Sequence, residues 1–276
     1  MNKITLISAD KKSKVKIEKG ELISFEKENQ EYIHQKGNKG WRKADDEMFP
    51  VIGPTDKNNY IIHTKNGDAI QDQHGLLREM SYDEISSDEN TASFIKKYEK
   101  NTKIKNSKFP AKSSEEFLFW PFDFSFEKSF SLENGVLKIE FTITSQEEMP
   151  FMLGYHPAFL LSDTGKETFV ANDKEYTLDN ILTAGSNAFP ILETDKITLK
   201  NIDKKDLEIT TKGFDNFMLW TEVNNMVCIE PITHYTSYNK IKIGFIFELP
   251  KGIKFIKTFI PITIKQIFDI NNNTLY

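Results

Sequence analysis

The fold class follows from residues 124–144, which read FSFEKSFSLENGVLKIEFTIT. Apolar side chains recur at every second position in both halves of this stretch, as in a β-strand with one buried face. Between the halves, Glu133-Asn134-Gly135 is a sequence typical of a tight turn. We therefore predict an antiparallel hairpin, whose first strand presents one face made of Phe124, Phe126, Lys128, Phe130 and Leu132.

Similar short runs occur along the rest of the chain, at residues 15–17, 22–25, 60–63, 217–222, 226–230, 241–249 and 253–264. Turn pairs such as Asn66-Gly67, Asn224-Asn225 and Lys251-Gly252 separate many of them. Helix-start patterns at residues 81–85 and 113–117 do not continue with a period of 3.6 residues. We predict an all-β protein, a large antiparallel β-sandwich.

The length of 276 residues is compatible with one large domain or two small ones. Hydrophobic residues make up 38%, which is enough for a substantial core. The chain contains no internal repeat, low-complexity tract or linker-like segment. A single domain over residues 1–276 is the preferred interpretation, and two domains are the alternative.

The charge balance excludes several classes of protein. With 36 basic and 41 acidic residues, the net charge of −5 provides no broad positive field for nucleic acid. The single cysteine, Cys228, cannot form an internal disulfide. The N-terminal apolar run is too short for a signal peptide, and no run has the length of a membrane span. These features predict a soluble cytoplasmic protein without a nucleic-acid or membrane partner.

Three residues stand out as candidates for chemistry. His74 precedes a glycine, which allows close backbone approach to a ligand. His156 is followed by Pro157, which restricts it to an extended conformation. Glu230 is placed at the end of an apolar strand, where a carboxylate is costly unless it is paired or functional. Taken singly, each of these residues is also compatible with a structural or solvated role.

The remaining histidines carry less information. His34 and His63 lie in ordinary strand contexts and are interpreted as structural, while His234 stays ambiguous. Two histidines and a glutamate are compatible with a His/His/Glu metal site or with general acid–base catalysis. The metal site lacks the i, i+4 spacing common in helical zinc motifs. The Ser nucleophile elbow, the P-loop and the dinucleotide-binding pattern are all absent from the sequence.

Five short blocks, taken together and in this order, resemble the aldose 1-epimerase (galactose mutarotase) family, and within it the LacX-like branch. They span nearly the whole chain and read EMFPVIG (47–53), QHGLLR (73–78), WPFDF (120–124), MPFMLGYHPAF (149–159) and VCIEP (227–231). The resemblance implies a large antiparallel sandwich with an open sugar-binding cleft. It also implies an isomerase without cofactor or metal, in which Glu230 is the base, His156 the acid and His74 a ligand of the sugar near its ring oxygen.

The resemblance also indicates further substrate-binding positions. The family often has an arginine several residues before Phe-Pro; that register falls on Lys43, with Arg42 beside it. After Glu230-Pro231 this chain has Ile232 where the branch often has an aromatic residue. An aspartate also assists in many relatives, and Asp215 is the candidate for it. From their own chemistry, Arg78 offers a fixed set of donors, and Trp41, Phe159 and Trp220 offer flat apolar surface for the face of a pyranose. Core packing is the alternative for each aromatic residue and the preferred one for Phe159.

Anomer exchange needs a proton to leave the C1 hydroxyl while another reaches the ring oxygen, and one carboxylate with one imidazolium is sufficient. We expect Glu230 to favour the charged form of His156. The expected partner is an aldohexose or its phosphate, bound by a monomer or homodimer. Two alternatives remain: a hexose-6-phosphate 1-epimerase, which would need a cluster of Arg or Lys, and a non-catalytic sugar-binding sandwich.

Overall fold

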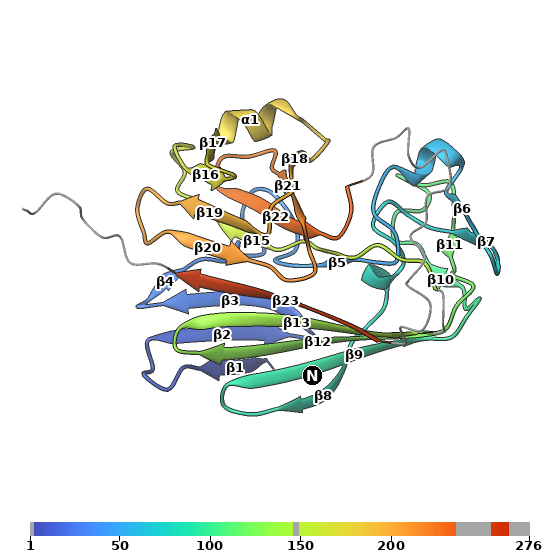
Figure 1. Cartoon of the computed structure of the whole chain (residues 1–276), viewed down its shortest axis with the longest axis horizontal. Helices are drawn as coiled ribbons and strands as arrows, with labels where there is room; N and C mark the ends of the chain where they lie inside the picture. Colours follow the sequence, from blue (N-terminus) through green and yellow to red (C-terminus); the bar gives the residue numbers. More distant parts are fainter. Residues whose placement is uncertain (1–2, 146–148, 236–254, 265–276) are drawn as a thin grey trace, which may run out of the picture.

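A computed structural model describes residues 3–145, 149–235 and 255–264; in the last segment, Ile262 is the one residue whose side chain is described. Within these ranges nearly all regular structure is antiparallel β-sheet (Figure 1). The largest sheet has nine strands, in the order β17 (Lys174–Thr177), β16 (Thr168–Ala171), β19 (Lys196–Lys200), β20 (Leu207–Thr210), β23 (Phe255–Ile264), β13 (Val136–Ser145), β12 (Phe124–Glu133), β9 (Thr91–Tyr98) and β8 (Asp83–Ser87).

A second sheet of six strands contains β18 (Phe189–Leu192), β21 (Asn216–Trp220), β22 (Met226–Ile232), β14 (Gly154–Tyr155) and β5 (Glu47–Met48), and β15 (Ala158–Leu160) also pairs with β22. A four-stranded sheet consists of β1 (Ile4–Ile7), β2 (Ser13–Glu18), β3 (Glu21–Lys27) and β4 (Gln30–Glu31). The small pairs are β6 (Ile61–Thr64) with β7 (Gly67–Ile70) and β10 (Ile104–Lys105) with β11 (Phe117–Leu118). Short helices are α1 (Leu178–Thr183), and the 3₁₀ turns η1 (Thr55–Asn58) and η2 (Leu77–Glu79).

The predicted hairpin is confirmed and lies in the middle of the nine-stranded sheet. Glu133 pairs with Val136 across the two-residue turn. Both turn residues, Asn134 and Gly135, have positive φ, 50° and 73°, as the twist of a two-residue hairpin requires. The alternation is also as expected, because the face of β12 that carries Lys128 is buried along its whole length.

The sheets pack on one another through a continuous apolar core, which confirms the predicted sandwich. Phe141 of β13 packs against Tyr155 of β14 and against Phe214, next to β21. The N-terminal sheet contacts β12 and β9 and contributes Leu6 and Phe25, among others, to the same core. This arrangement holds the strands β14, β15 and β22 rigidly over the apolar face of the central hairpin.

Several local expectations can be compared with the structure. Residues 81–85 enter the strand β8 and residues 113–117 lead into β11, so neither forms a helix, as the missing 3.6-residue period indicated. Helix α1 was not expected; the Thr177 backbone N–H at its start donates to Asn180 Oδ1 at 2.9 Å. The expected run 217–222 ends at Trp220. The expected run 241–249 and the turn Lys251-Gly252 lie outside the described residues.

Strand β22 continues two residues beyond the predicted end, to Ile232, so that Glu230 lies inside a fully buried strand and not at its end. Because no solvent surrounds its carboxyl group, the burial of Glu230 is more severe than the sequence indicated. In the described part of the chain, no helix is both long and apolar enough to span a membrane.

Candidate active site

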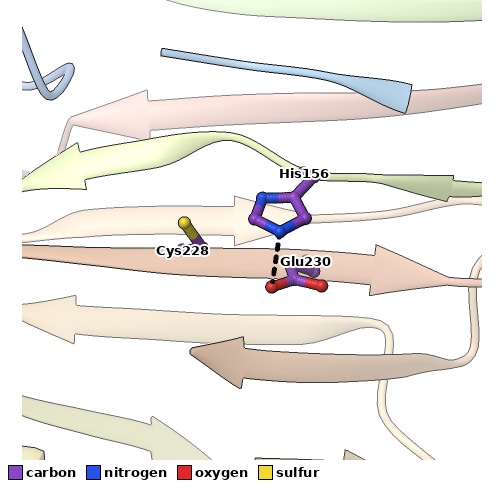
Figure 2. A group of neighbouring side chains, drawn as sticks. All are labelled: His156, Cys228 and Glu230. Atoms are coloured by element: carbon purple, nitrogen blue, oxygen red, sulfur yellow. Dashed lines mark ion pairs between the residues drawn. The ribbon is translucent and has the colours of Figure 1, made fainter. Parts of the chain in front are cut away.

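His156 and Glu230 face each other across two neighbouring strands. The pairing of β14 with β22 aligns Gly154 with Ile232, and the pairing of β15 with β22 continues the same register. Continued through the residues between β14 and β15, this register places His156 opposite Glu230. Their side chains meet with Nε2 of His156 3.2 Å from Oε1 of Glu230 (Figure 2). The predicted acid and base are therefore brought into contact by strand pairing.

Burial determines the charge state of this pair. His156 is 5% exposed and Glu230 is 2% exposed. Burial raises the pKa of Glu230 to about 8. Burial, together with the positive charges of Arg78 and Lys43, lowers the pKa of His156 to about 3. The expectation that Glu230 would favour a charged imidazole is thus wrong, because desolvation dominates both pKa shifts and places the proton on Glu230.

Two tryptophans surround the imidazole of His156. The Trp41 ring stacks on it, with centroids 4.3 Å apart and an interplanar angle of 26°. Trp220 approaches edge-on, with centroids 6.4 Å apart. Both indoles are partly exposed and pack against a small apolar cluster beside the pair. Phe159, by contrast, is wholly buried in the main core, which agrees with the core-packing alternative and not with a surface for the sugar.

His74 reaches the same place from a turn after β7. Its ring centroid lies 5.5 Å from that of His156. The next residue, Gly75, packs directly on the backbone of Phe49. It has φ of 69°, and a Cβ there would lie 2.0 Å from the carbonyl oxygen of Phe49. The Phe49 backbone N–H in turn donates to the His74 carbonyl at 3.1 Å. The Phe-Pro and His-Gly blocks therefore pack together because glycine permits backbone contact.

The cationic candidates are held by a carboxylate that sequence reasoning missed. Lys43 Nζ donates to Asp46 Oδ2 at 2.7 Å, and Arg78 Nε lies 3.5 Å from the same oxygen. The backbone of Asp46 also exchanges two hydrogen bonds with that of His156, at 3.1 and 2.8 Å. Arg42 is exposed and does not join this group. The acidic run directly before the Met-Phe-Pro segment was the available signal for Asp46.

Asp215 occupies a different position from the other candidates. It is exposed, just before β21, and its carbonyl accepts a hydrogen bond from the Thr194 backbone N–H at 2.9 Å. Its charge acts on His234, whose pKa is lowered by burial. Among the described residues, no hydrogen bond or ion pair connects Asp215 with Glu230.

The other two histidines have local partners. Nε2 of His34, which is buried, contacts the Trp41 carbonyl oxygen at 2.8 Å and so supports the loop that carries Trp41. His63 is exposed and pairs with Asp68, with Nδ1 2.7 Å from Oδ1. Both placements agree with a structural interpretation.

One group in the described part of the chain has the composition of a metal site, and it differs from the His/His/Glu set considered above. One ligand atom each from His156, Cys228 and Glu230 lies within 4.8 Å of the others (Figure 2). Cys228 was missed as a neighbour of the pair, although its position two residues before Glu230 on a strand indicates the same face. Burial raises the pKa of its thiol well above the usual value, so the thiol is protonated.

Comparisons with solved structures agree with the fold described above. The chain resembles the solved structure of a galactose mutarotase related enzyme from Lactobacillus acidophilus, with a TM-score of 0.74, 19% identity, and coverage of 97% of this chain and 99% of that one. A galactose mutarotase-like protein from Lactobacillus casei gives 0.74, 17%, 96% and 100%. A galactose 1-epimerase from Lactobacillus acidophilus gives 0.64, 11%, 95% and 94%. At these identities the likeness establishes the fold. No curated relative matches the sequence.

The family is established by a family model. The model for aldose 1-epimerase matches residues 56–237, which is more than half of the chain and includes the segments that carry His74, His156 and Glu230. The sandwich fold of its structural neighbours is the one found here. The chain belongs to the aldose 1-epimerase family.

Proposed function

We propose that this protein is an aldose 1-epimerase that interconverts the α and β anomers of an aldohexose without a cofactor. The observation that carries the proposal is the buried contact of 3.2 Å between Nε2 of His156 and Oε1 of Glu230. A proton donor and a proton acceptor are thereby held next to each other, beside two partly exposed indoles. Ring opening of a cyclic hemiacetal needs this combination of groups.

The proposed reaction moves one proton onto the pair and one off it. Glu230 takes the proton of the C1 hydroxyl as the C1–O5 bond breaks and O1 becomes the aldehyde oxygen. His156 delivers a proton to O5, which leaves as a hydroxyl group. Rotation about C1–C2 exposes the other face of the aldehyde, and the reverse transfers close the ring. The pair holds one proton before and after each step, so the enzyme is regenerated without a co-reactant.

We expect a bound sugar to change which residue of the pair, Glu230 or His156, carries that proton. Burial by the protein alone favours a neutral carboxyl and a neutral imidazole. The reactive form, an ionised Glu230 and a protonated His156, differs only in which side of the 3.2 Å contact carries the proton. Hydroxyl groups of a bound sugar donate to the carboxylate and replace the hydrogen bonds that burial removes, which favours the ionised form.

An uncharged sugar suits the site better than a sugar phosphate. In the described part of the chain, the two cations whose charges lower the pKa of His156 are Lys43 and Arg78, and both are held by Asp46. Arg42 is exposed and does not contact Asp46. A phosphate would have to compete with the Asp46 carboxylate for both cations. Trp41 and Trp220 offer flat apolar surface for a pyranose, which requires no charge on the substrate.

Polarimetry tests the proposal. Freshly dissolved α-glucose and α-galactose should reach anomeric equilibrium faster with protein than without it, in a buffer of low phosphate concentration. A coupled assay with α-glucose 6-phosphate should give a lower kcat/KM. The matched control is Glu230→Gln, which keeps the size of the side chain and removes the base. Binding of sugar without acceleration of either anomerisation would instead establish the non-catalytic sugar-binding sandwich.

A further inference from the structure

Arg78 contacts a histidine of the site through its side chain. It lies in the turn η2, four residues after His74, and its side chain is 8% exposed. Its Nη1 atom is 2.6 Å from Nδ1 of His74. The predicted role of Arg78 as a direct ligand of the sugar is therefore not the role to which this contact points.

The chemistry of the two groups determines the direction of this hydrogen bond. A guanidinium group has only donors and stays protonated at all relevant pH values. Nδ1 of His74 must therefore be the acceptor and cannot carry a proton. A neutral imidazole has one protonated nitrogen, so the proton of His74 is on Nε2. Burial, and then the charge of Arg78, also hold the pKa of His74 well below the usual 6.5, so the doubly protonated ring is disfavoured.

We propose that Arg78 is a positioning residue that holds His74 as the neutral Nε2–H tautomer, so that His74 presents one hydrogen-bond donor and no transferable second proton. The identity of the acceptor, an oxygen of the sugar, rests on the proposed function; the tautomer itself does not. This arrangement separates the two histidines, because His156 contacts a carboxyl group that shares a proton with it, whereas His74 contacts a permanent cation.

Asp46 extends this assignment to both histidines. Its carboxylate lies 3.5 Å from Nε of Arg78, and this contact orients the guanidinium group. The same carboxylate also accepts a hydrogen bond from Lys43. Its backbone pairs with the backbone of His156. One residue on the loop before β5 therefore places the ring of His74 through Arg78 and the chain of His156 directly.

The test is nitrogen NMR of the full-length protein labelled with ¹⁵N-histidine, with the His74 signals identified from a His74→Gln spectrum. In the wild type we expect an unprotonated Nδ1 and a protonated Nε2 for His74. Arg78→Lys keeps a donor and should preserve this pattern. Arg78→Met removes the donor and should move both signals toward the averaged positions of exchanging tautomers. Lys43→Met is the matched control, because it removes a nearby cation that does not contact Nδ1, and it should leave the tautomer unchanged.

Two results would overturn the proposal: a wild-type His74 with its proton on Nδ1, or a shift in Lys43→Met as large as that in Arg78→Met. The tautomer of His74 is measured in the wild type, so the test does not depend on the folding of a variant at position 78. In kinetics with an aldohexose, Arg78→Met should raise KM on the order of tenfold with a smaller change in kcat. If the tautomer is as assigned but no sugar is turned over, the proposed function fails and this assignment stands.

Discussion

Two buried groups of ionisable residues in the described part of this protein differ in their charge: one is neutral and the other is ionised. The first is the pair His156 and Glu230. The second, which we call the lysine cluster, contains Lys128 of β12, Asp45 and Glu47. Lys128 is fully buried, and its Nζ donates to Asp45 Oδ2 at 2.5 Å and to Glu47 Oε1 at 2.7 Å. The residues of both groups are at most 5% exposed, so burial alone cannot explain how they differ.

The pKa values of the two groups differ because only the lysine cluster contains a cation, Lys128, that stays protonated when buried. Burial would raise the pKa of Glu47, but Lys128 and Lys96 bring it down to about 2. Burial would lower the pKa of Lys128, but the two carboxylates raise it to about 12. Among the described residues no lysine or arginine pairs with Glu230, and burial takes its pKa to about 8. Asp45 is intermediate, because burial raises its pKa to about 6 although Lys128 opposes the rise. Glu47, which faces two lysines, therefore stays charged, whereas Glu230 opposite an imidazole holds a proton that can move.

The lysine cluster also orients the site. Asp45 and Glu47 point toward Lys128, while Asp46 between them points to Lys43 and Arg78, as alternation along an extended chain requires. Tyr155, which directly precedes His156 in the chain, donates its hydroxyl hydrogen to Asp45 Oδ2 at 2.7 Å. The cluster thus connects the residues around β5, and the strand segment that leads to His156, to the central hairpin.

The largest expected effect is on turnover after Glu230→Gln. The amide keeps the shape of the side chain but cannot accept the proton, so kcat/KM for anomerisation should fall on the order of 10⁴-fold. Coupled assays of the variant and the wild type at the same pH measure this loss. Turnover near that of the wild type, in a variant with a normal thermal melt, would remove Glu230 from the mechanism.

His156→Ala should lower kcat and kcat/KM together, on the order of 10²–10⁴-fold, because its contribution is made in the transition state. His74→Ala should mainly raise KM, since His74 is a donor held by Arg78. Saturation curves and thermal melts of both variants separate the two roles. If His74→Ala abolishes kcat and His156→Ala changes only KM, the assignments are reversed.

The two buried groups should also respond oppositely when a carboxyl is made neutral. The pKa of Glu230 rises from 4.5 to about 8 on folding, so the wild type loses stability between these pH values. At pH 8, Glu230→Gln should therefore be more stable, by on the order of 4 kcal/mol. Glu47→Gln should be less stable, by about 3–5 kcal/mol, because it uncovers part of the charge of Lys128. Chemical denaturation at pH 5 and pH 8 measures both; a destabilised Glu230→Gln at pH 8 would contradict the comparison.

The pH dependence of kcat/KM should reflect a pair that works with one proton. Above pH of about 8 that proton is lost from Glu230 and activity should fall, approaching tenfold per pH unit. The acid limb, where His156 gains a second proton, should lie far below neutrality, near pH 3. This order reverses the simple expectation that the carboxylate gives the acid limb and the imidazole the alkaline limb. An alkaline limb near pH 6.5 would show that burial does not control the pair.

The smallest expected effect is that of a chelator. Because the proposed reaction uses only the proton shared by His156 and Glu230, dialysis against a strong chelator should leave the rate unchanged. Cys228 completes a possible ligand set, so the result is informative. Loss of activity that is restored by Zn²⁺ would favour a metal-dependent reaction instead.

The sequence alone determined the features that depend on near neighbours in the chain. Alternation at every second position identified the central hairpin and its turn, and even placed Lys128 on the apolar face. Pro157 and Pro231 restricted His156 and Glu230 to extended conformations, and Gly75 indicated a close backbone approach beside His74. These inferences hold because strand periodicity and backbone preferences are local.

The tertiary structure decided what those residues do to one another. The contact of His156 with Glu230 depends on the register of two strands more than 70 residues apart in the chain, and the roles of Asp46 and Arg78 depend on a turn packing against a loop. The same is true of the charge states, since a pKa depends on how much water the surrounding sheets exclude and on which charge lies opposite. Neither quantity is a property of a short segment, and for this reason the same acidic side chain stays charged at Glu47 and holds a proton at Glu230.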